Sequence, residues 1–329
     1  MEARGFSAAL AVLCLFSLGA GGRTENFLVF ATDPQLASEV AQAAEIYRRD
    51  LALQWLGREL PRWREPCPIT VQAGPRKGAG GETSFYFSQH GPQGWKMRVQ
   101  GTRQRILDSV LPHEITHTIF ATHFRRPLPR WADEGACTTV EHVSERNIQN
   151  RFLIEFLTTE RGIAFNRMFA MKEYPEDIMP LYSQGYSLAR YLLAHPGGKR
   201  KFIKYLGDGM DSDNWPAATR KHYGYKDLSD LQTTWLDWVR QQSKTPLKLS
   251  ESMLVQRAIR RLDAPVLAAS QVPVRLVSAP APPAPVTRSA ATMISLPSVG
   301  WYAAQRDRAQ NGGTPSVSVS VRDDGGRLR

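Results

Sequence analysis

The chain has few cysteines and, beyond its N-terminus, no long apolar run. Its 329 residues include three cysteines. A bilayer-spanning helix needs roughly 20 consecutive apolar residues, and no stretch after the N-terminal run reaches that length, so we expect no transmembrane span in the mature chain. The formal net charge is +11, but the basic residues are scattered and no nucleic-acid-binding motif accompanies them. We therefore expect no nucleic-acid partner.

The N-terminus has the composition of an export signal. Arg4 provides a positive charge, and residues 6–20 form an uncharged run rich in alanine and leucine that ends in small residues. This order is typical of a secretory signal peptide, here cleaved near Ala20 to Gly22. We predict a signal peptide over residues 1–22 and an exported protein, located in the periplasm, the cell envelope or the extracellular space. Without cleavage, the run would act as an anchor.

Removal of the signal, which contains Cys14, leaves Cys67 and Cys137. In an oxidising compartment such a pair can form one disulfide, which would stabilise the fold by up to about 4 kcal/mol. Two independent buried thiols are the alternative. The sequence leaves both open, because it does not show whether the two β-carbons meet.

The first part of the mature chain has the pattern of strands around one long helix. Residues 27–31 are typical of a buried strand. Asp33 and Pro34 are a suitable N-cap and first residue for a helix that ends at Gly57. The further expected strands, joined by the glycine-rich turns KGAGGE and HGPQG, are PITVQAG from Pro68, SFYFS from Ser84 and WKMRV from Trp95.

From about Thr102 to about Lys244 the apolar residues recur at helical spacing. Strands followed by helices predict an α+β fold, with a small mixed N-terminal sheet and a mostly helical C-terminal part, in one domain over residues 23–245. Residues 246–329 become rich in proline, alanine, serine and glycine. Because such a segment cannot bury enough apolar surface to offset the entropy of ordering it, we expect a linker and a disordered tail.

The residues that predict chemistry lie between Leu111 and Glu141. His113 and His117 are four residues apart on a helical pattern, which places their side chains on one face about 6 Å apart. That spacing suits two imidazoles that bind one tetrahedral Zn²⁺. Glu114 projects roughly 100° further round the helix. There its carboxylate can act as general base on a metal-activated water without binding the metal itself.

A catalytic zinc site needs a third protein ligand and an open fourth position. Sixteen residues separate His117 from Glu134, and Pro127 and Pro129 within them end one helix before another begins. Such a return can bring Glu134 back over the metal. We therefore predict a Zn²⁺ cofactor bound by the two histidines and Glu134.

The segments HEITH (113–117) and ADEGACTTVE (132–141) resemble the gluzincins, zinc peptidases whose HExxH motif is followed by a downstream glutamate in an EG context. The nearest pattern is that of peptidase-MA-like domains, related to the thermolysin and membrane alanyl aminopeptidase families, and it covers about residues 27–244. The resemblance implies a zincin-like fold and a peptide or protein substrate. The zinc ligands and general base that it implies are His113, His117, Glu134 and Glu114.

Two further residues take roles from this resemblance. Glu141 falls where the family also carries a glutamate and would orient a metal ligand; an ordinary surface glutamate is the alternative. Tyr182 and Gly185 match the Tyr-x-x-Gly pattern of an aminopeptidase helix, so Tyr182 would donate a hydrogen bond to the tetrahedral oxyanion. Tyr186, one turn later, is its competitor, and packing in the core is the alternative for both tyrosines.

The sequence departs from the aminopeptidases in the strand before the motif. Those enzymes carry a glutamate in a GxMEN-type segment that captures a free N-terminus, whereas GWKMRVQG here contains Lys96 and Arg98 and no acidic residue. We therefore expect an endopeptidase, in which residues 97–101 form an edge strand that pairs with an extended peptide.

The sequence thus predicts an exported zinc-dependent peptidase. Two rival functions would use the same residues. One is a cell-envelope scaffold or binding protein with a non-catalytic zinc, closed by a fourth protein ligand for which Cys137 is the candidate. The other is a zinc hydrolase that acts on non-peptide amide bonds.

Overall fold

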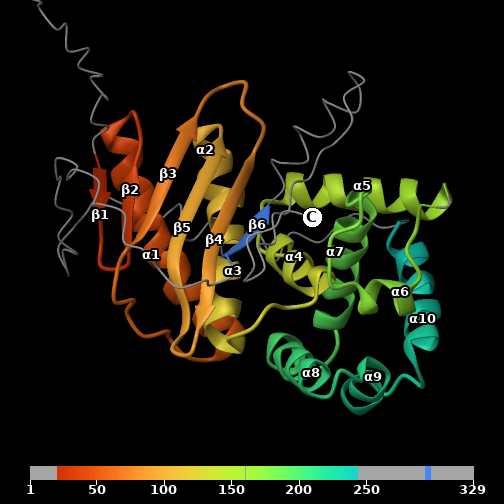
Figure 1. The fold of residues 1–329 in the computed structure, drawn as a ribbon. Coiled ribbons are helices and arrows are strands. Elements are labelled where there is room, and N and C mark those ends of the chain that lie inside the picture. Colours follow the sequence, from red (N-terminus) through yellow and green to blue (C-terminus); the bar gives the residue numbers. More distant parts are fainter. Residues whose placement is uncertain (1–20, 160, 244–292, 298–329) are drawn as a thin grey trace, which may run out of the picture.

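The fold is given by a computed structural model that describes residues 21–159, 161–243 and 293–297, the last by backbone alone. Apart from one helix after the second strand and a short strand near the C-terminus, strands come first and helices follow, which confirms the expected α+β class. Figure 1 shows the sheet on one side of the molecule and most of the helices on the other. Of the predicted signal peptide only Gly21 and Gly22 are among the described residues, and of the predicted tail only residues 293–297.

The strands are β1 (Gly21–Arg23), β2 (Phe27–Phe30), β3 (Cys67–Ala73), β4 (Gly80–Ser88), β5 (Gly91–Gly101) and β6 (Met293–Pro297). They form one mixed sheet in the order β1-β2-β3-β5-β4-β6. Strands β2, β3 and β5 are parallel neighbours, while β1 pairs antiparallel with β2 and β4 pairs antiparallel with both β5 and β6. The strand β6 is a regular element that the composition of the C-terminal segment does not indicate.

Residues 97–101 do not form an edge strand, so that prediction is wrong. They belong to β5, where Met97 is opposite Ile69 of β3 on one side and opposite Thr83 of β4 on the other. After β3 the chain first forms β4, which is not a neighbour of β3. It then turns back through a tight hairpin into β5, which lies between β3 and β4. The outermost of the five N-terminal strands on this side is therefore β4. The hairpin also extends into both glycine-rich segments, since β4 starts at Gly80 and β5 at Gly91.

The helices are α1 (Pro34–Leu56), α2 (Arg103–Arg105), α3 (Leu111–Phe124), α4 (Arg130–Thr138), α5 (Val143–Thr158), α6 (Phe165–Ala170), α7 (Met179–Leu193), α8 (Gly198–Ser212), α9 (Trp215–Tyr223) and α10 (Leu228–Gln242). The ends of α1 are as predicted: Asp33 accepts a hydrogen bond from the backbone N–H of Gln35 at 2.9 Å, and Gly57 caps the C-terminus. α1 packs against β1, β2 and α3, within one apolar core that extends from Phe27 to Val239. Among the described helices, none has the length and apolar character that a bilayer span requires.

A π-helical turn, Ile106–Val110, leads directly into α3. The backbone N–H of Leu111 bonds to the carbonyl of Ile106, five residues back. Pro112 follows and has no N–H to contribute to a regular helical turn. Turns of this kind occur frequently at functional sites, and this one begins α3 immediately before His113. α3 then lies against β4, β5 and α4, so it links the sheet to the helical half.

Candidate metal centre

α3 places the two motif histidines together in the interior. The imidazole rings of His113 and His117 are one helical turn apart, with ring centroids separated by 4.9 Å. Both side chains are buried, and Glu114 between them is fully buried. Helical spacing therefore puts three groups with acid–base or ligand chemistry in one place, away from solvent.

Each histidine is held by a carboxylate from the segment that contains α4. Nδ1 of His113 is 2.6 Å from Oε1 of Glu141, and Nδ1 of His117 is 2.9 Å from Oδ1 of Asp133. An ionised carboxylate can only accept a hydrogen bond, so Nδ1 carries the proton in both rings, and in a neutral ring Nε2 keeps a free lone pair that can bind a metal. A histidine that binds a metal is typically held in this way.

The two Nε2 atoms converge on Glu134. Oε2 of Glu134 is 3.4 Å from Nε2 of His113 and 3.7 Å from Nε2 of His117. All three atoms are buried and have no hydrogen-bond partner among the described residues. The other oxygen of Glu134, Oε1, accepts a hydrogen bond from the hydroxyl of Tyr174 at 2.8 Å. Oε1 of Glu134 is thus held by a hydrogen bond from Tyr174, whereas Oε2 lies within 4 Å of the Nε2 atoms of both histidines.

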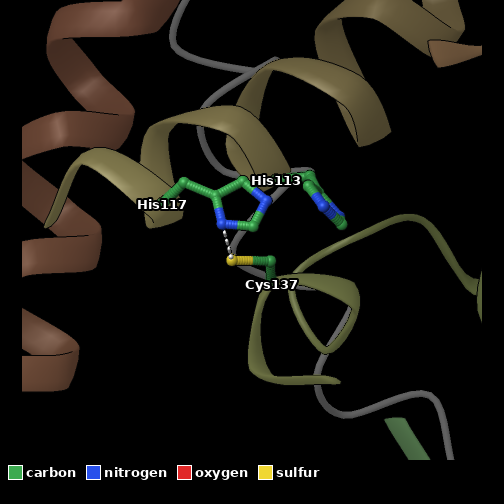
Figure 2. A group of neighbouring side chains, drawn as sticks. All are labelled: His113, His117 and Cys137. Atoms are coloured by element: carbon green, nitrogen blue, oxygen red, sulfur yellow. Dashed lines mark hydrogen bonds between the residues drawn. The ribbon is translucent and has the colours of Figure 1, made fainter. Parts of the chain in front are cut away.

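Cys137 of α4 is the remaining potential donor. His113, His117 and Cys137 offer ligand atoms within 4.8 Å of one another, so this buried group could hold a metal ion. Figure 2 shows the sulfur of Cys137 facing the ring of His117, 3.3 Å from Nδ1. That nitrogen is the one that bonds Asp133. Burial raises the pKa of the Cys137 thiol well above its usual value, and nearby carboxylates such as Asp133 raise it further.

Cys67 and Cys137 are both free and buried. Of the two arrangements that the sequence left open, the structure therefore has the separate thiols. Cys67 begins β3, which β5 separates from β4 in the sheet.

Negative charge dominates this buried cluster. Burial lowers the pKa of His113, but the nearby carboxylates of Glu134, Glu141 and Glu114 outweigh it and raise that pKa well above its ordinary value. Burial also raises the pKa of Glu141, which its contact with His113 partly offsets. Buried charges need partners of opposite sign. The site therefore favours a cation, and the four acidic side chains in it are Glu114, Asp133, Glu134 and Glu141.

Glu114 lies against strand β4. The hydroxyl of Thr83 donates to Oε2 of Glu114 at 2.6 Å. A Cβ added at Gly81 would lie 2.6 Å from Oε1 of Glu114, so the absence of a side chain at that position makes room for the carboxylate. Neither Thr83 nor Gly81 was predicted from the sequence, because nothing in the local pattern says which glycine of KGAGGE faces α3.

Two glycines bring α4 and α7 into backbone contact. A Cβ at Gly135 would lie 2.3 Å from the carbonyl oxygen of Gly185, and a Cβ at Gly185 would lie 2.5 Å from the carbonyl oxygen of Trp131. Any larger residue would force the helices apart. The glycine that follows Glu134 and the glycine of the Tyr-x-x-Gly segment thus have one shared purpose, which is to hold the helix that carries Glu134 in place.

Tyr182 of α7 is buried and stacks on the ring of Tyr174, with ring centroids 6.3 Å apart. It therefore lies one ring away from Glu134, and Tyr186 is buried on the same helix. The residue in direct contact with Glu134, Tyr174, was not predicted, since it lies between α6 and α7 without a motif. Burial raises the pKa of Tyr174 well above its usual range, and Glu134 raises it further, so the hydroxyl stays protonated as a donor.

No model of a known protein family matches the chain, and no curated protein sequence is significantly similar to it. What the site can do therefore follows from its own geometry and chemistry. Two imidazoles and a thiol that could hold a metal ion lie buried together, and a carboxylate oxygen lies within 4 Å of both imidazoles.

Proposed function

We propose that the chain is a zinc-dependent peptidase whose metal ligands are His113, His117 and Glu134. The observation that carries this proposal is the convergence of three atoms, Nε2 of His113, Nε2 of His117 and Oε2 of Glu134. None of them has a hydrogen-bond partner among the described residues. The separations of 3.4 and 3.7 Å are close to the roughly 3.4 Å between donor atoms around a tetrahedral zinc with bonds of about 2.0–2.1 Å. Two imidazoles and one carboxylate are also a frequent donor set of catalytic zinc sites.

Glu134 is preferred to Cys137 as the third ligand for two reasons. The atom of His117 nearest to the thiol is Nδ1, which already donates to Asp133. A thiolate would also add a further negative charge beside four buried carboxylates, against the raised pKa of the thiol. Glu134, by contrast, directs an unengaged oxygen at the Nε2 lone pairs.

A zinc ion held by these residues would supply Lewis acidity, which polarises a carbonyl group and makes a water molecule more acidic. Glu114 would accept a proton from that water while the oxygen of the water bonds to the carbonyl carbon. Glu114 would then return the proton to the nitrogen as the C–N bond breaks. Thr83 positions the carboxylate of Glu114 in advance through the 2.6 Å hydrogen bond. Tyr182 remains the proposed donor to the oxyanion, as the resemblance to aminopeptidases implies.

The proposal includes a zincin-like fold of the gluzincin type. It is supported by β4, which lies beside α3 at the outer side of the N-terminal sheet, and by α4, which returns Glu134 towards the motif histidines. Action within a peptide chain is supported by β5, which carries Lys96 and Arg98 where aminopeptidases have an acid that captures a free N-terminus. We also propose export, from the composition of residues 1–22.

The test uses the chain that begins at Gly21, because β1 starts there. Bound zinc is measured, and the protein is incubated with a mixed peptide library whose products are sequenced. We expect one equivalent of zinc and internal cleavage that disappears in Glu114→Gln while the zinc content is unchanged. Absence of zinc would overturn the metal site, and zinc without cleavage of any peptide would overturn the peptidase.

A scaffold with a closed zinc site is the second candidate, favoured by the 3.3 Å approach of Cys137 to His117. Cys137→Ser distinguishes the two, because it would release the metal from a closed site and leave it bound in the catalytic one. A hydrolase of non-peptide amides would share the entire site. It would be recognised by Glu114-dependent hydrolysis of small amides in the absence of peptide cleavage.

A further inference from the structure

The outer edge of β4 is covered by a segment from the C-terminal part of the same chain. β6 runs antiparallel to β4, with Met293 opposite Tyr86 and Pro297 opposite Glu82. In Figure 1, β6 (blue) lies beside β4 on the side that faces the helical half. Within the described part of the sheet, β6 is the last strand at this edge.

The covered stretch of β4 is the part that supports the general base. Leu296 is opposite Thr83, whose hydroxyl holds Glu114. Gly81, against which Glu114 also lies, immediately precedes Glu82, the last paired residue of β4. The pairing of β6 therefore runs along the backbone that borders the candidate catalytic residues.

A sheet edge binds an extended backbone through main-chain hydrogen bonds, with little demand on sequence. One side of β4 can make such a ladder with one strand at a time, since its other side is paired with β5. An extended substrate that reaches Glu114 along β4 and the strand β6 would therefore need the same N–H and C=O groups. The two cannot be bound together.

We propose that residues 293–297 are a built-in competitor for the peptide-binding edge of this protein, which restricts access to the site until the segment is displaced. The inference rests on the proposed function for the identity of the substrate. A segment tethered to its own site has an effective concentration on the order of 1 mM. The apparent dissociation constant of a competing peptide is then its intrinsic value divided by the fraction of molecules in which β6 is released from β4.

The test measures peptide binding without catalysis, in the full chain from Gly21 with Glu114→Gln. The probe is a fluorescent peptide with the sequence of residues 290–300, followed by anisotropy. Ile294→Pro/Ser295→Pro releases the edge, because neighbouring strand residues direct their N–H groups to opposite sides and one of the two prolines must remove a ladder donor. Val317→Pro/Ser318→Pro is the matched control, a Val-Ser pair outside β6.

We expect the released variant to bind the probe more tightly than the parent and the control. If it binds at about 10 µM, an effective concentration of about 1 mM makes the other two bind about 100-fold more weakly. Equal affinity in all three proteins would overturn the proposal.

Hydrogen exchange of the backbone amides of residues 82–86 is the second measurement. We expect faster exchange in the released variant than in the control, because β6 no longer pairs with β4. Unchanged exchange would show that β6 does not protect this edge, and faster exchange without tighter probe binding would show that the edge is not a peptide site; either result overturns the proposal. Neither readout needs hydrolysis, so a failed peptidase assay leaves this test valid. If the chain with Glu114 intact cleaves peptides but the two proline substitutions do not accelerate that cleavage, the result counts against this inference and not against the proposed function.

Discussion

Replacing Gly81 with alanine should slow catalysis without removing any chemical group from the site. The added Cβ would lie 2.6 Å from Oε1 and 2.8 Å from Cγ of Glu114. Ordinary contact between such atoms requires about 3.5 Å, so the carboxylate has to move by roughly 1 Å. A displacement of that size in a reacting group can cost about 10²-fold in rate, equivalent to about 2.7 kcal/mol of activation free energy. The end of a flexible side chain can yield, so we expect little change in the free energy of unfolding.

The assay compares kcat, KM, zinc content and the urea midpoint of the variant with those of the parent. Gly207→Ala in α8 is the matched control, because nothing lies within 4 Å of the Cβ that it adds and alanine is favoured over glycine in helices. A kcat equal to that of the parent would refute the argument that contact with β4 positions Glu114 for catalysis. Loss of zinc would show that the ligands, rather than the base, had moved.

Glu141→Gln should weaken zinc binding about 10- to 100-fold in a chelator competition assay, since it removes the charge that orients His113; Glu155→Gln, a solvent-exposed change on α5, is the control, and equal affinity for both variants would contradict the reasoning. Glu134→Gln should weaken zinc binding more than Glu141→Gln does, and the reverse order would count against Glu134 as a ligand. Without zinc, stability should fall as pH rises. Although burial opposes it, carboxylates raise the pKa of His113 and His117, so the folded chain binds protons that the unfolded chain releases. This stabilisation is complete below the ordinary histidine value of about 6.5 and is lost as pH rises through the folded values. Urea midpoints in chelator across this range check the sign, and a midpoint that rises with pH would refute it.

Helical periodicity made the meeting of His113 and His117 predictable, because a four-residue spacing fixes which side chains share a face regardless of the rest of the fold. The ends of α1 were predictable for the same reason, since Asp33 and Gly57 act through bonds to residues within one turn. The prolines between His117 and Glu134 made a break between two helices predictable, but not the glycine contact that holds α4 in place.

The order of strands could not be predicted locally. A hairpin beside β3 can be placed with either strand inward, and the alternation of side chains in β4 and β5 is compatible with both. In the observed order β4 lies against α3, where Gly81 leaves room for Glu114 and Thr83 provides its hydrogen-bond donor. The contact of Tyr174 with Glu134 and the pairing of β6 with β4 likewise join residues that are far apart in the chain.

The contact between Gly135 and Gly185 also determines when the site can form. Both histidines and Glu134 are synthesised before α7, the helix against which α4 closes. A nascent chain would thus contain both histidines and Glu134 before α7 is available to hold the helix that carries Glu134. Domains generally become stable only as complete units. Tight binding of the proposed metal would therefore be a late event, which would follow completion of the helical half and could serve as a marker that the domain has finished folding.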